Sequence, residues 1–311
     1  MNSPRHSYPS GGTARPSRGL AQETRDILRF YHVRPRQQLG QNFLIDEEAL
    51  RSVVQAANLG PDSQVLEIGP GIGSLTLALA ETGATVSALE LDAAMAAIAT
   101  ARTEGWDNVR VSEGNVLHAD LSTLIEVQRG FSVVANIPYY ITAPILRLFL
   151  EGPARPRSLV LMVQSEVGDR LAAPPGKMSA LSVFAQVYAS VEVLRRVPPS
   201  SFLPPPEVAS AVIRLVVHEQ PPVPAAELPY LFAVVKAGVS AKRKMLHNSL
   251  DHALPNAGAV IQQALERAEI AGTRRAESLS IPEWRLLARM LAEDRANVPR
   301  RARVSAEAWS E

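Results

Sequence analysis

An apolar run that leads directly into three closely spaced glycines is the feature that most constrains how this chain can fold. Residues 65–74 read Val-Leu-Glu-Ile-Gly-Pro-Gly-Ile-Gly-Ser, and the following residues 75–80 have a helical pattern. Glycines at such a turn let a ligand approach the backbone and let the helix pack closely on the strand. The spacing differs from the Gly-x-Gly-x-x-Gly that holds a pyrophosphate, which weakens a dinucleotide interpretation. The segment predicts a strand–turn–helix unit with a ligand at its turn.

Two later strands also end in polar residues. Residues 84–90 form a short strand that ends at Glu90, and the apolar residues 131–135 lead to Asn136. The carboxyl ends of parallel strands meet at one edge of an open α/β sheet, where such folds bind ligands. A carboxylate there can accept hydrogen bonds from both hydroxyls of a ribose. Strand and helix signals alternate to about Leu171, so we expect a doubly wound, Rossmann-like parallel sheet.

The tetrapeptide Asn136-Ile-Pro-Tyr139 offers an uncommon pair of acceptors. The Asn136 side chain has a carbonyl oxygen, and Pro138 holds Ile137 extended so that its own carbonyl turns outward. Two acceptors beside the ring of Tyr139 suit a planar base with an exocyclic amino group. Such a tetrapeptide alone is also typical of an ordinary turn, so its weight depends on the motifs that precede it.

Together and in this order, these motifs resemble S-adenosylmethionine-dependent methyltransferases that act on exocyclic amines. Further segments narrow the resemblance to the KsgA family of ribosomal RNA adenine N6,N6-dimethyltransferases, from about Arg34 to Leu250. These segments are Arg-Pro-Arg-Gln-Gln-Leu-Gly-Gln-Asn-Phe-Leu-Ile-Asp over 34–46, Leu-Met-Val-Gln-Ser-Glu-Val-Gly-Asp-Arg-Leu over 161–171, Leu-Ser-Val over 181–183 and Val-Pro-Pro-Ser-Ser-Phe-Leu-Pro-Pro-Pro-Glu-Val over 197–208.

The resemblance implies an enzyme that uses S-adenosyl-L-methionine, without a metal, to dimethylate two adjacent adenosines in the 3′-terminal hairpin of small-subunit (16S) ribosomal RNA. It implies ribosomal RNA and the small ribosomal subunit precursor as partners, for a cytoplasmic monomer in ribosome biogenesis that does not bind a membrane. Two alternatives stay open. One is an Erm-type enzyme that methylates a large-subunit adenosine and confers macrolide resistance, and the other is a non-catalytic nucleic-acid-binding relative. Intact Glu90, Asn136, Pro138 and Tyr139 argue against the second, and the Leu-Ser-Val and Phe-Leu-Pro-Pro-Pro segments favour KsgA over Erm.

The resemblance also implies where the cofactor binds. Asn115 stands where the family usually has Asp, the acceptor for the adenine amino group of the cofactor. An amide oxygen can still accept that bond, at roughly half the strength of a charged acceptor. Residues 174–180, near the substrate in the family, lack the usual Tyr-Gly. The cofactor-binding residues that we expect are Asn42, Leu44, Gly69, Gly71, Glu90, Asn115 and Asn136.

On the substrate side, Asn136 and the carbonyl of Ile137 would accept the two hydrogens of adenine N6. This favours a pyramidal nitrogen whose lone pair points at the methyl group, so no general base is needed to start the transfer. The base must leave its stack, and Tyr139 and Phe202 would replace the lost stacking at roughly 1–3 kcal/mol per base. A core position is the alternative for Phe202. The catalytic residues that we expect are Asn136, Ile137, Pro138, Tyr139 and Phe202.

Chain length and composition indicate the domain organisation. With 311 residues, 46% of them hydrophobic, the chain can hold roughly two domains with proper cores. It has no cysteine for a disulfide or thiolate metal site, and no run of the roughly 20 apolar residues that a membrane helix needs. For residues 1–19, which are expected to be a disordered basic tail, an organelle transit peptide is the alternative. We expect a disordered basic tail over residues 1–19, the methyltransferase domain over 20–220, a small all-helical RNA-binding domain over 225–297 and a disordered tail over 298–311.

Local signals predict several elements. Asp46 can cap a helix whose Leu50, Val53, Val54 and Ala57 face the core. Ala209–Val217 is a plausible last strand of the sheet. The expected helices of the second domain cover residues 231–250, 258–271 and 281–291, the last one starting at Ser280.

Because the net charge is only +1, RNA binding requires local basic patches. The stretch from Leu228 to Leu250 contains five basic or histidine residues and no acid. Basic side chains neutralise phosphates, although a solvated helix face is the alternative for such a run. The RNA-binding residues that we expect are Lys236, Lys242, Arg243 and Lys244, with Arg34 and Arg36 beside the mouth of the cofactor site.

Overall fold

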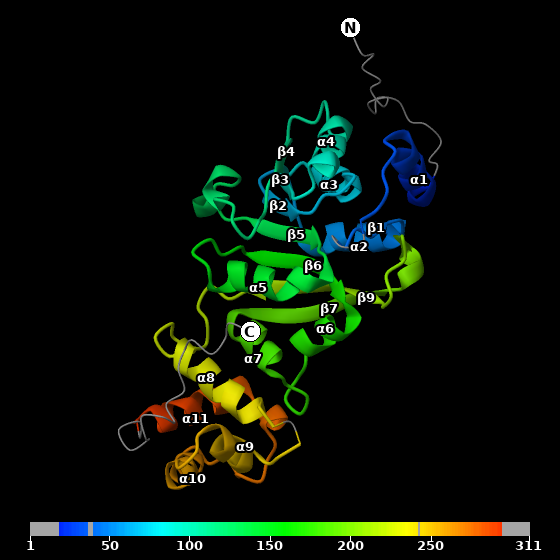
Figure 1. The fold of residues 1–311 in the computed structure, drawn as a ribbon. Helices are drawn as coiled ribbons and strands as arrows, with labels where there is room; N and C mark the ends of the chain where they lie inside the picture. The colour runs from blue at the N-terminus through cyan, green and yellow to red at the C-terminus, as the bar shows by residue number, and fades with distance from the viewer. Residues whose placement is uncertain (1–18, 37–39, 242, 294–311) are drawn as a thin grey trace. The chain divides into compact units, whose positions relative to one another are not determined.

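The computed structural model describes residues 19–36, 40–241 and 243–293 (Figure 1). The chain divides into two compact units, Met1–Gly168 with Glu192–Val217 and Asp169–Val191 with His218–Glu311. Lys242, the tail expected over 298–311 and all but the last residue of the tail expected over 1–19 lie outside the described residues. Within the described ranges, no helix is both long and apolar enough to cross a membrane.

The first unit is built on a seven-stranded sheet with the strand order β4-β3-β2-β5-β6-β9-β7. Strands β4, β3, β2, β5 and β6 are parallel, and β9 runs antiparallel to β6. The predicted α/β, Rossmann-like fold is therefore confirmed, with β9 as the expected last strand along the chain. The strands are β2 (Gln64–Ile68), β3 (Thr85–Glu90), β4 (Val109–Glu113), β5 (Ser132–Asn136), β6 (Ser158–Gln164), β7 (Ala189–Val197) and β9 (Ser210–Val217).

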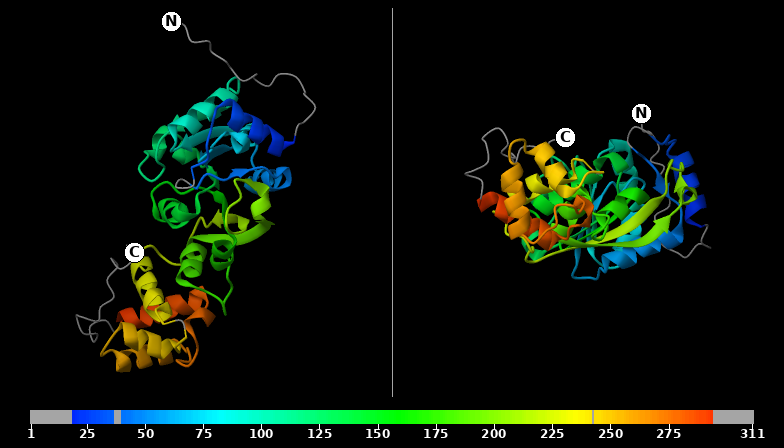
Figure 2. Two further views of the ribbon diagram at one scale, coloured as in Figure 1. Left: turned by 45° about the vertical axis from the view of Figure 1, so that its right-hand side comes forward. Right: turned by 90° about the horizontal axis from the view of Figure 1, so that it is seen from below.

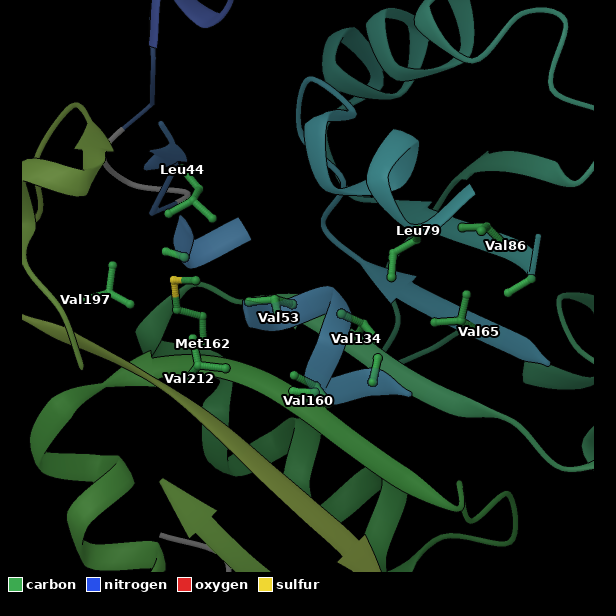
Figure 3. Packing of buried hydrophobic residues seen from close by; sticks show 14 of the residues in the cluster. Leu44, Val53, Val65, Leu79, Val86, Val134, Val160, Met162, Val197 and Val212 are labelled. Carbon is green, nitrogen blue, oxygen red and sulfur yellow. The ribbon is translucent and has the colours of Figure 1, made fainter. Parts of the chain in front are cut away.

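Helix α2 (Glu47–Ala57) packs on one face of this sheet. It begins as predicted at Asp46, whose side chain accepts hydrogen bonds of 3.0 Å from two backbone N–H groups of the first turn. Val53 of α2 lies against side chains that point to the same face, among them Val134 of β5 and Val160 of β6 (Figure 3). The predicted core positions of the helix all belong to this cluster, Val53 and Ala57 as buried members and Leu50 and Val54 as partly buried ones.

The other elements of the first unit connect these strands. Helices α3 (Ser74–Ala80) and α4 (Ala93–Arg102) follow β2 and β3, as the alternation of strand and helix signals requires. A two-stranded antiparallel pair joins β1 (Phe43–Leu44) to β8 (Phe202–Leu203). The remaining helices are α1 (Leu20–Phe30), α5 (Thr142–Glu151) and α6 (Ser165–Leu171).

The second unit is helical (Figure 2). It also contains residues 169–191, which were expected in the methyltransferase domain. Within this unit α7 packs on α8, where the ring of Phe184 in α7 lies 5.7 Å from the ring of Phe232 in α8. The helices of this unit are α7 (Ala180–Tyr188), α8 (Leu228–Val239), α9 (Leu246–Ala253), α10 (Gly258–Arg267) and α11 (Ile281–Glu293).

The stretch expected as one helix over residues 231–250 is two helices, α8 and α9, joined by a turn. The N–H group of Leu246, which has no partner within its own helix, donates to the carbonyl oxygen of Arg274 at 2.7 Å. This contact with a distant segment fixes the start of α9. Arg243 and Lys244 are therefore exposed in a turn and do not lie along a helix face.

Helix α11 begins where the sequence predicts, after Ser280. The Glu283 N–H donates to Ser280 Oγ at 3.4 Å, and the Ser280 N–H donates to Glu283 Oε2 at 2.7 Å. This reciprocal pair is a capping box, in which both end residues satisfy each other's backbone donors.

Candidate active site

A cavity of about 290 Å³ opens at the carboxyl edge of the parallel strands. Its size is near the lower end of the roughly 300–1,000 Å³ that is typical of small-molecule sites. Strands β2 to β5 all end at this edge, so the residues that follow them come together although they are far apart in the sequence. All seven predicted cofactor-binding residues line the cavity: Asn42, Leu44, Gly69, Gly71, Glu90, Asn115 and Asn136. That they bind the cofactor stays a prediction.

The Glu90 carboxylate is buried and held by two backbone N–H groups. Gly71 N donates to Oε2 and Asp92 N donates to Oε1, both at 2.9 Å. Gly71 has a φ of +56°, and a Cβ added there would lie 3.2 Å from the ring of Phe43, so glycine is required. Burial raises the pKa of Glu90, and the hydrogen bonds oppose that rise. Since a carboxylate offers about four acceptor sites, two remain for the hydroxyls of a ribose.

The orientation of Asn136 is fixed by the segment that precedes β1. Its amide nitrogen Nδ2 donates to the carbonyl oxygen of Asn42 at 3.1 Å. A carbonyl oxygen can only accept, so the amide nitrogen must face Asn42 and Oδ1 must face away from it. Asn42 is itself held, because its side-chain nitrogen donates to the carbonyl oxygen of Gly40 at 3.2 Å. Oδ1 and the second hydrogen of Nδ2 are therefore left for a ligand.

The other residues of the tetrapeptide divide between the cavity wall and the interior. Pro138 lines the cavity, whereas Ile137 is buried. Tyr139 is not among the residues that line the cavity, and its hydroxyl lies 2.7 Å from Ser210 Oγ on β9. Burial raises the pKa of the Tyr139 hydroxyl, which therefore stays protonated. The stacking role of Tyr139 stays a prediction.

Phe202 lies in the core, the alternative given for it above. It is 3% exposed, packs among the buried residues of the first unit and pairs with Leu44 in the β1–β8 ladder. Tyr140, in contrast, lines the cavity and is 60% exposed. The sequence did not single out Tyr140, because the 3₁₀ turn over Tyr139–Ile141 decides which of the adjacent tyrosines meets the cavity. The stacking role of Phe202 stays a prediction.

Asn115 uses its only side-chain oxygen within its own turn. Oδ1 accepts a hydrogen bond of 3.0 Å from the N–H group of Leu117. One lone pair of that oxygen remains, whereas an aspartate would offer a second, unused oxygen to the cavity. The departure from the family pattern therefore removes an acceptor from the wall that is expected to meet the cofactor's adenine.

Glu67 is a cavity residue that the sequence did not reveal, because it is an acid inside an otherwise apolar strand. It is 1% exposed, and neither of its carboxylate oxygens has a hydrogen-bond partner in the described part of the chain. Burial raises the pKa of Glu67 to about 8; the nearby Thr76 hydroxyl, although outside hydrogen-bonding geometry, opposes this rise, and the charge of Glu90 adds to it. Glu67 is thus mostly protonated at neutral pH.

These residues fit S-adenosylmethionine, which carries a ribose, an adenine and two cationic centres. Glu90 can hold the ribose, the glycine turn permits close approach, and Glu67 is a buried acid in the cavity wall. No three histidine or carboxylate side chains within the described ranges are grouped to hold a metal ion.

The predicted RNA-binding residues occur in both units. Arg34 and Arg36 are both exposed, and the guanidinium of Arg36 also lies 3.2 Å from the carboxylate of Asp92. In the helical unit, Lys236, Arg243 and Lys244 are exposed, and Lys242 lies outside the described residues. Their contacts with RNA stay a prediction.

Replacing Glu67 with glutamine should change the pH dependence of stability. The pKa of Glu67 is about 8 in the folded chain against 4.5 for a free carboxyl, so the stability that the neutral form provides is complete below pH 4.5 and falls as the pH rises toward about 8. Glutamine stays neutral throughout. We expect the melting temperature of Glu67→Gln, relative to the parent, to rise over this interval, while the exposed control Glu113→Gln shows no such trend. A difference that does not vary with pH would contradict the assignment.

Replacing Asn115 with aspartate should tighten the binding of S-adenosylmethionine or leave it unchanged. The aspartate would keep the bond to Leu117 N and add a charged acceptor, which is roughly twice as strong as a neutral one. Calorimetric titration of both proteins with the cofactor measures the effect. Weaker binding by the aspartate variant would show that the cavity has been rebuilt around the amide.

Comparisons with known proteins show the family of the chain. The sequence profile described as ribosomal RNA adenine dimethylase matches residues 33–293. The ribosomal RNA small subunit methyltransferase A of Alkaliphilus metalliredigens is 40% identical over 276 residues, which cover 87% of this chain and 96% of that protein. A dimethyladenosine transferase from Plasmodium falciparum has a similar structure, with a TM-score of 0.68 and 25% identity over 82% of this chain and 98% of that one.

The structure of the 23S rRNA methyltransferase ErmE is also similar, with a TM-score of 0.65 and 27% identity over 81% of this chain and all of that one. The family profile spans most of the chain, and the relative from Alkaliphilus is aligned over nearly its whole length. The chain therefore belongs to the ribosomal RNA adenine dimethylase family.

Proposed function

We propose that this protein uses S-adenosylmethionine to dimethylate N6 of two adjacent adenosines in the 3′-terminal hairpin of small-subunit ribosomal RNA, as a step of ribosome biogenesis. The observation that carries the proposal is the fixed amide of Asn136, a residue of the cavity wall whose Nδ2 is bonded to Asn42 and whose Oδ1 has no bond to that partner. In the proposed role the enzyme is a cytoplasmic monomer that acts on the small-subunit precursor. The relatives that are about 40% identical and carry the name ribosomal RNA small subunit methyltransferase A support this choice of RNA.

The proposed mechanism depends on orientation. When bound, S-adenosylmethionine supplies a methyl group that is already activated for transfer. Asn136 Oδ1 and the backbone carbonyl of Ile137 accept the two N6 hydrogens of the target adenosine, which favours a pyramidal nitrogen with its lone pair directed at the methyl group. Glu90 holds the ribose of the donor, and the exposed ring of Tyr140 is available at the cavity beside the tetrapeptide. No side chain is required to remove a proton before the methyl group moves.

RNA binding is assigned to the helical unit, with a smaller part for the segment before β1. Arg243 and Lys244 protrude from the turn between α8 and α9, where two cations can follow a phosphate backbone. The alternative is that these basic residues only solvate the face of a helix. Arg243 and Lys244 lie in an exposed turn and not on a helix face, which favours the RNA-binding role.

The Erm-type alternative has less support. The ErmE structure shares the fold and has a sequence identity of 27%. The curated relatives named for the small subunit have a sequence identity of about 40%. The non-catalytic alternative requires a lost site, but the cavity, Glu90 and the oriented Asn136 are all present.

Mass mapping of dimethyladenosine in both ribosomal RNAs tests the proposed function. A strain that lacks the gene should lose two adjacent dimethyladenosines from small-subunit RNA, and the parent gene should restore them. Loss of a modification from large-subunit RNA would establish the Erm-type alternative. No loss from either RNA would leave the non-catalytic one.

Asn136→Ala should lower the rate of methyl transfer far more than it lowers RNA affinity. The bonds at issue are made to a nitrogen that becomes pyramidal, so they contribute most in the transition state. Single-turnover methylation and RNA binding should be measured on the same preparation. Equal losses in rate and affinity would show that Asn136 serves binding alone.

Replacing Arg243 and Lys244 with alanine should remove up to two phosphate contacts. The slope of log affinity against log salt would then flatten by up to about 2, with cofactor affinity intact. Arg267→Ala is a matched control, because that arginine lies in the same unit but is already paired with Glu293. The measurement belongs on naked RNA and on the assembling subunit. An unchanged slope on both would move the RNA-binding surface to the region of Arg34 and Arg36.

A further inference from the structure

Arg36, Gln41 and Asp92 form a cluster at the edge of the cavity, which we call the clasp. The guanidinium of Arg36 lies 3.2 Å from Asp92 Oδ2, and Gln41 Nε2 donates to the same oxygen at 3.2 Å. One carboxylate oxygen thus holds two side chains that are 5 positions apart in the sequence.

Two further hydrogen bonds join Arg36 and Gln41 directly. The Arg36 N–H donates to Gln41 Oε1 at 2.9 Å, and the Gln41 N–H donates to the carbonyl oxygen of Arg36 at 3.3 Å. The next contact is with the tetrapeptide, because a Cβ added at Gly40 would lie 2.9 Å from Cβ of Pro138. With a φ of +62°, Gly40 allows an approach that a side chain would prevent.

Asp92 provides the rigid end of the clasp. Its side chain is 5% exposed, and its Oδ1 accepts bonds from the N–H groups of Ala94 and Met95 at the start of α4. Its own N–H donates to Oε1 of Glu90, the residue expected to hold the ribose. The clasp therefore connects the ribose end of the cavity to the segment that carries Asn42.

That segment in turn orients the substrate amide. Gln41 is adjacent to Asn42, whose carbonyl oxygen accepts the hydrogen bond from Asn136 Nδ2. A continuous chain of contacts thus runs from Glu90 through Asp92 and Gln41 to Asn136. If the segment shifts, the carbonyl that fixes the amide shifts with it.

We propose that Arg36 and Asp92 are positioning residues for methyl transfer, which hold the segment of Gly40 to Asn42 so that Asn136 presents Oδ1 to the target amine. The inference rests on the proposed function for the role of Asn136. It gives the exposed Arg36 a task within its own chain, in addition to the phosphate contact expected from the sequence. A misplacement of about 1 Å at a reacting group can lower a rate on the order of 100-fold, so a pair remote from the chemistry can control it.

The test uses the full chain with Asp92→Asn and Arg36→Gln. Asparagine keeps an oxygen for the cap of α4 but places an NH₂ group opposite the two donors of the clasp, which breaks it without removing the cap. Arg34→Gln removes a neighbouring exposed charge outside the clasp. Arg195→Gln breaks an ion pair with Glu48 in the same unit and controls for the loss of a surface pair.

We expect Asp92→Asn and Arg36→Gln each to lower the single-turnover rate, by about 10- to 100-fold. The double variant should lose no more than the worse single one, because either change opens the same clasp. Asn136→Ala should cost less in the Asp92→Asn background than in the parent. Asp92→Asn should leave the salt dependence of RNA binding unchanged. Rate losses of Asp92→Asn and Arg36→Gln that multiply in the double variant would overturn the proposal. So would an equal rate loss from Asn136→Ala in the parent and in Asp92→Asn. Identical rates of Arg36→Gln and Arg34→Gln would overturn it as well.

A readout without catalysis separates this inference from the proposed function. The side-chain NH₂ signal of Asn136 in nitrogen–proton NMR spectra, assigned by its loss in Asn136→Ala, should shift in Asp92→Asn and Arg36→Gln but not in Arg195→Gln. An unshifted signal would overturn the positioning role even if the enzyme methylates RNA as proposed. A shifted signal in a protein that methylates no RNA would support the clasp and contradict the proposed function.

Discussion

The hydrogen bond from Asn136 Nδ2 to the carbonyl oxygen of Asn42 is the interaction on which the rest of the site depends. An asparagine amide can present a donor or an acceptor, and only a fixed partner decides which one a ligand meets. Because a backbone carbonyl cannot donate, this bond turns the NH₂ group toward Asn42 and leaves Oδ1 as an acceptor for a ligand. The parallel sheet places Asn136 at the cavity, but the segment before β1 gives its side chain a direction.

Two buried carboxyl groups beside the cavity, Glu90 and Glu67, differ in their hydrogen bonds and therefore in their charge. Glu90 accepts two backbone N–H groups, which offset part of the cost of its burial, whereas Glu67 has no hydrogen-bond partner in the described chain. The pKa of Glu67 accordingly rises to about 8. One carboxylate is arranged to accept hydroxyls, and the other is a mostly neutral group that a cationic ligand can ionise. A cofactor with both a ribose diol and cationic centres matches this pair.

Local signals predicted the parts of the structure that depend on neighbouring residues. Asp46 and Ser280 begin helices because each cap needs only the next turn of the chain. The ends of β3 and β5 were predictable because Glu90 and Asn136 follow apolar runs. The break between α8 and α9 was not, since it depends on a bond from Leu246 to the distant Arg274, and the ion pair of Arg36 with Asp92 joins equally separate segments. Glu67 and Phe202 show the same limit, because burial and cavity exposure are properties of the packed fold.

The most direct test of this account is a crystal structure of the protein with S-adenosylhomocysteine and an RNA hairpin that contains the target adenosines. The account predicts that the flipped adenine N6 lies about 3 Å from Asn136 Oδ1 and from the carbonyl oxygen of Ile137, with Asn136 Nδ2 still bonded to Asn42. An amide turned so that Nδ2 faces the base, or an N6 held by other groups with the Asn42 bond broken, would contradict it.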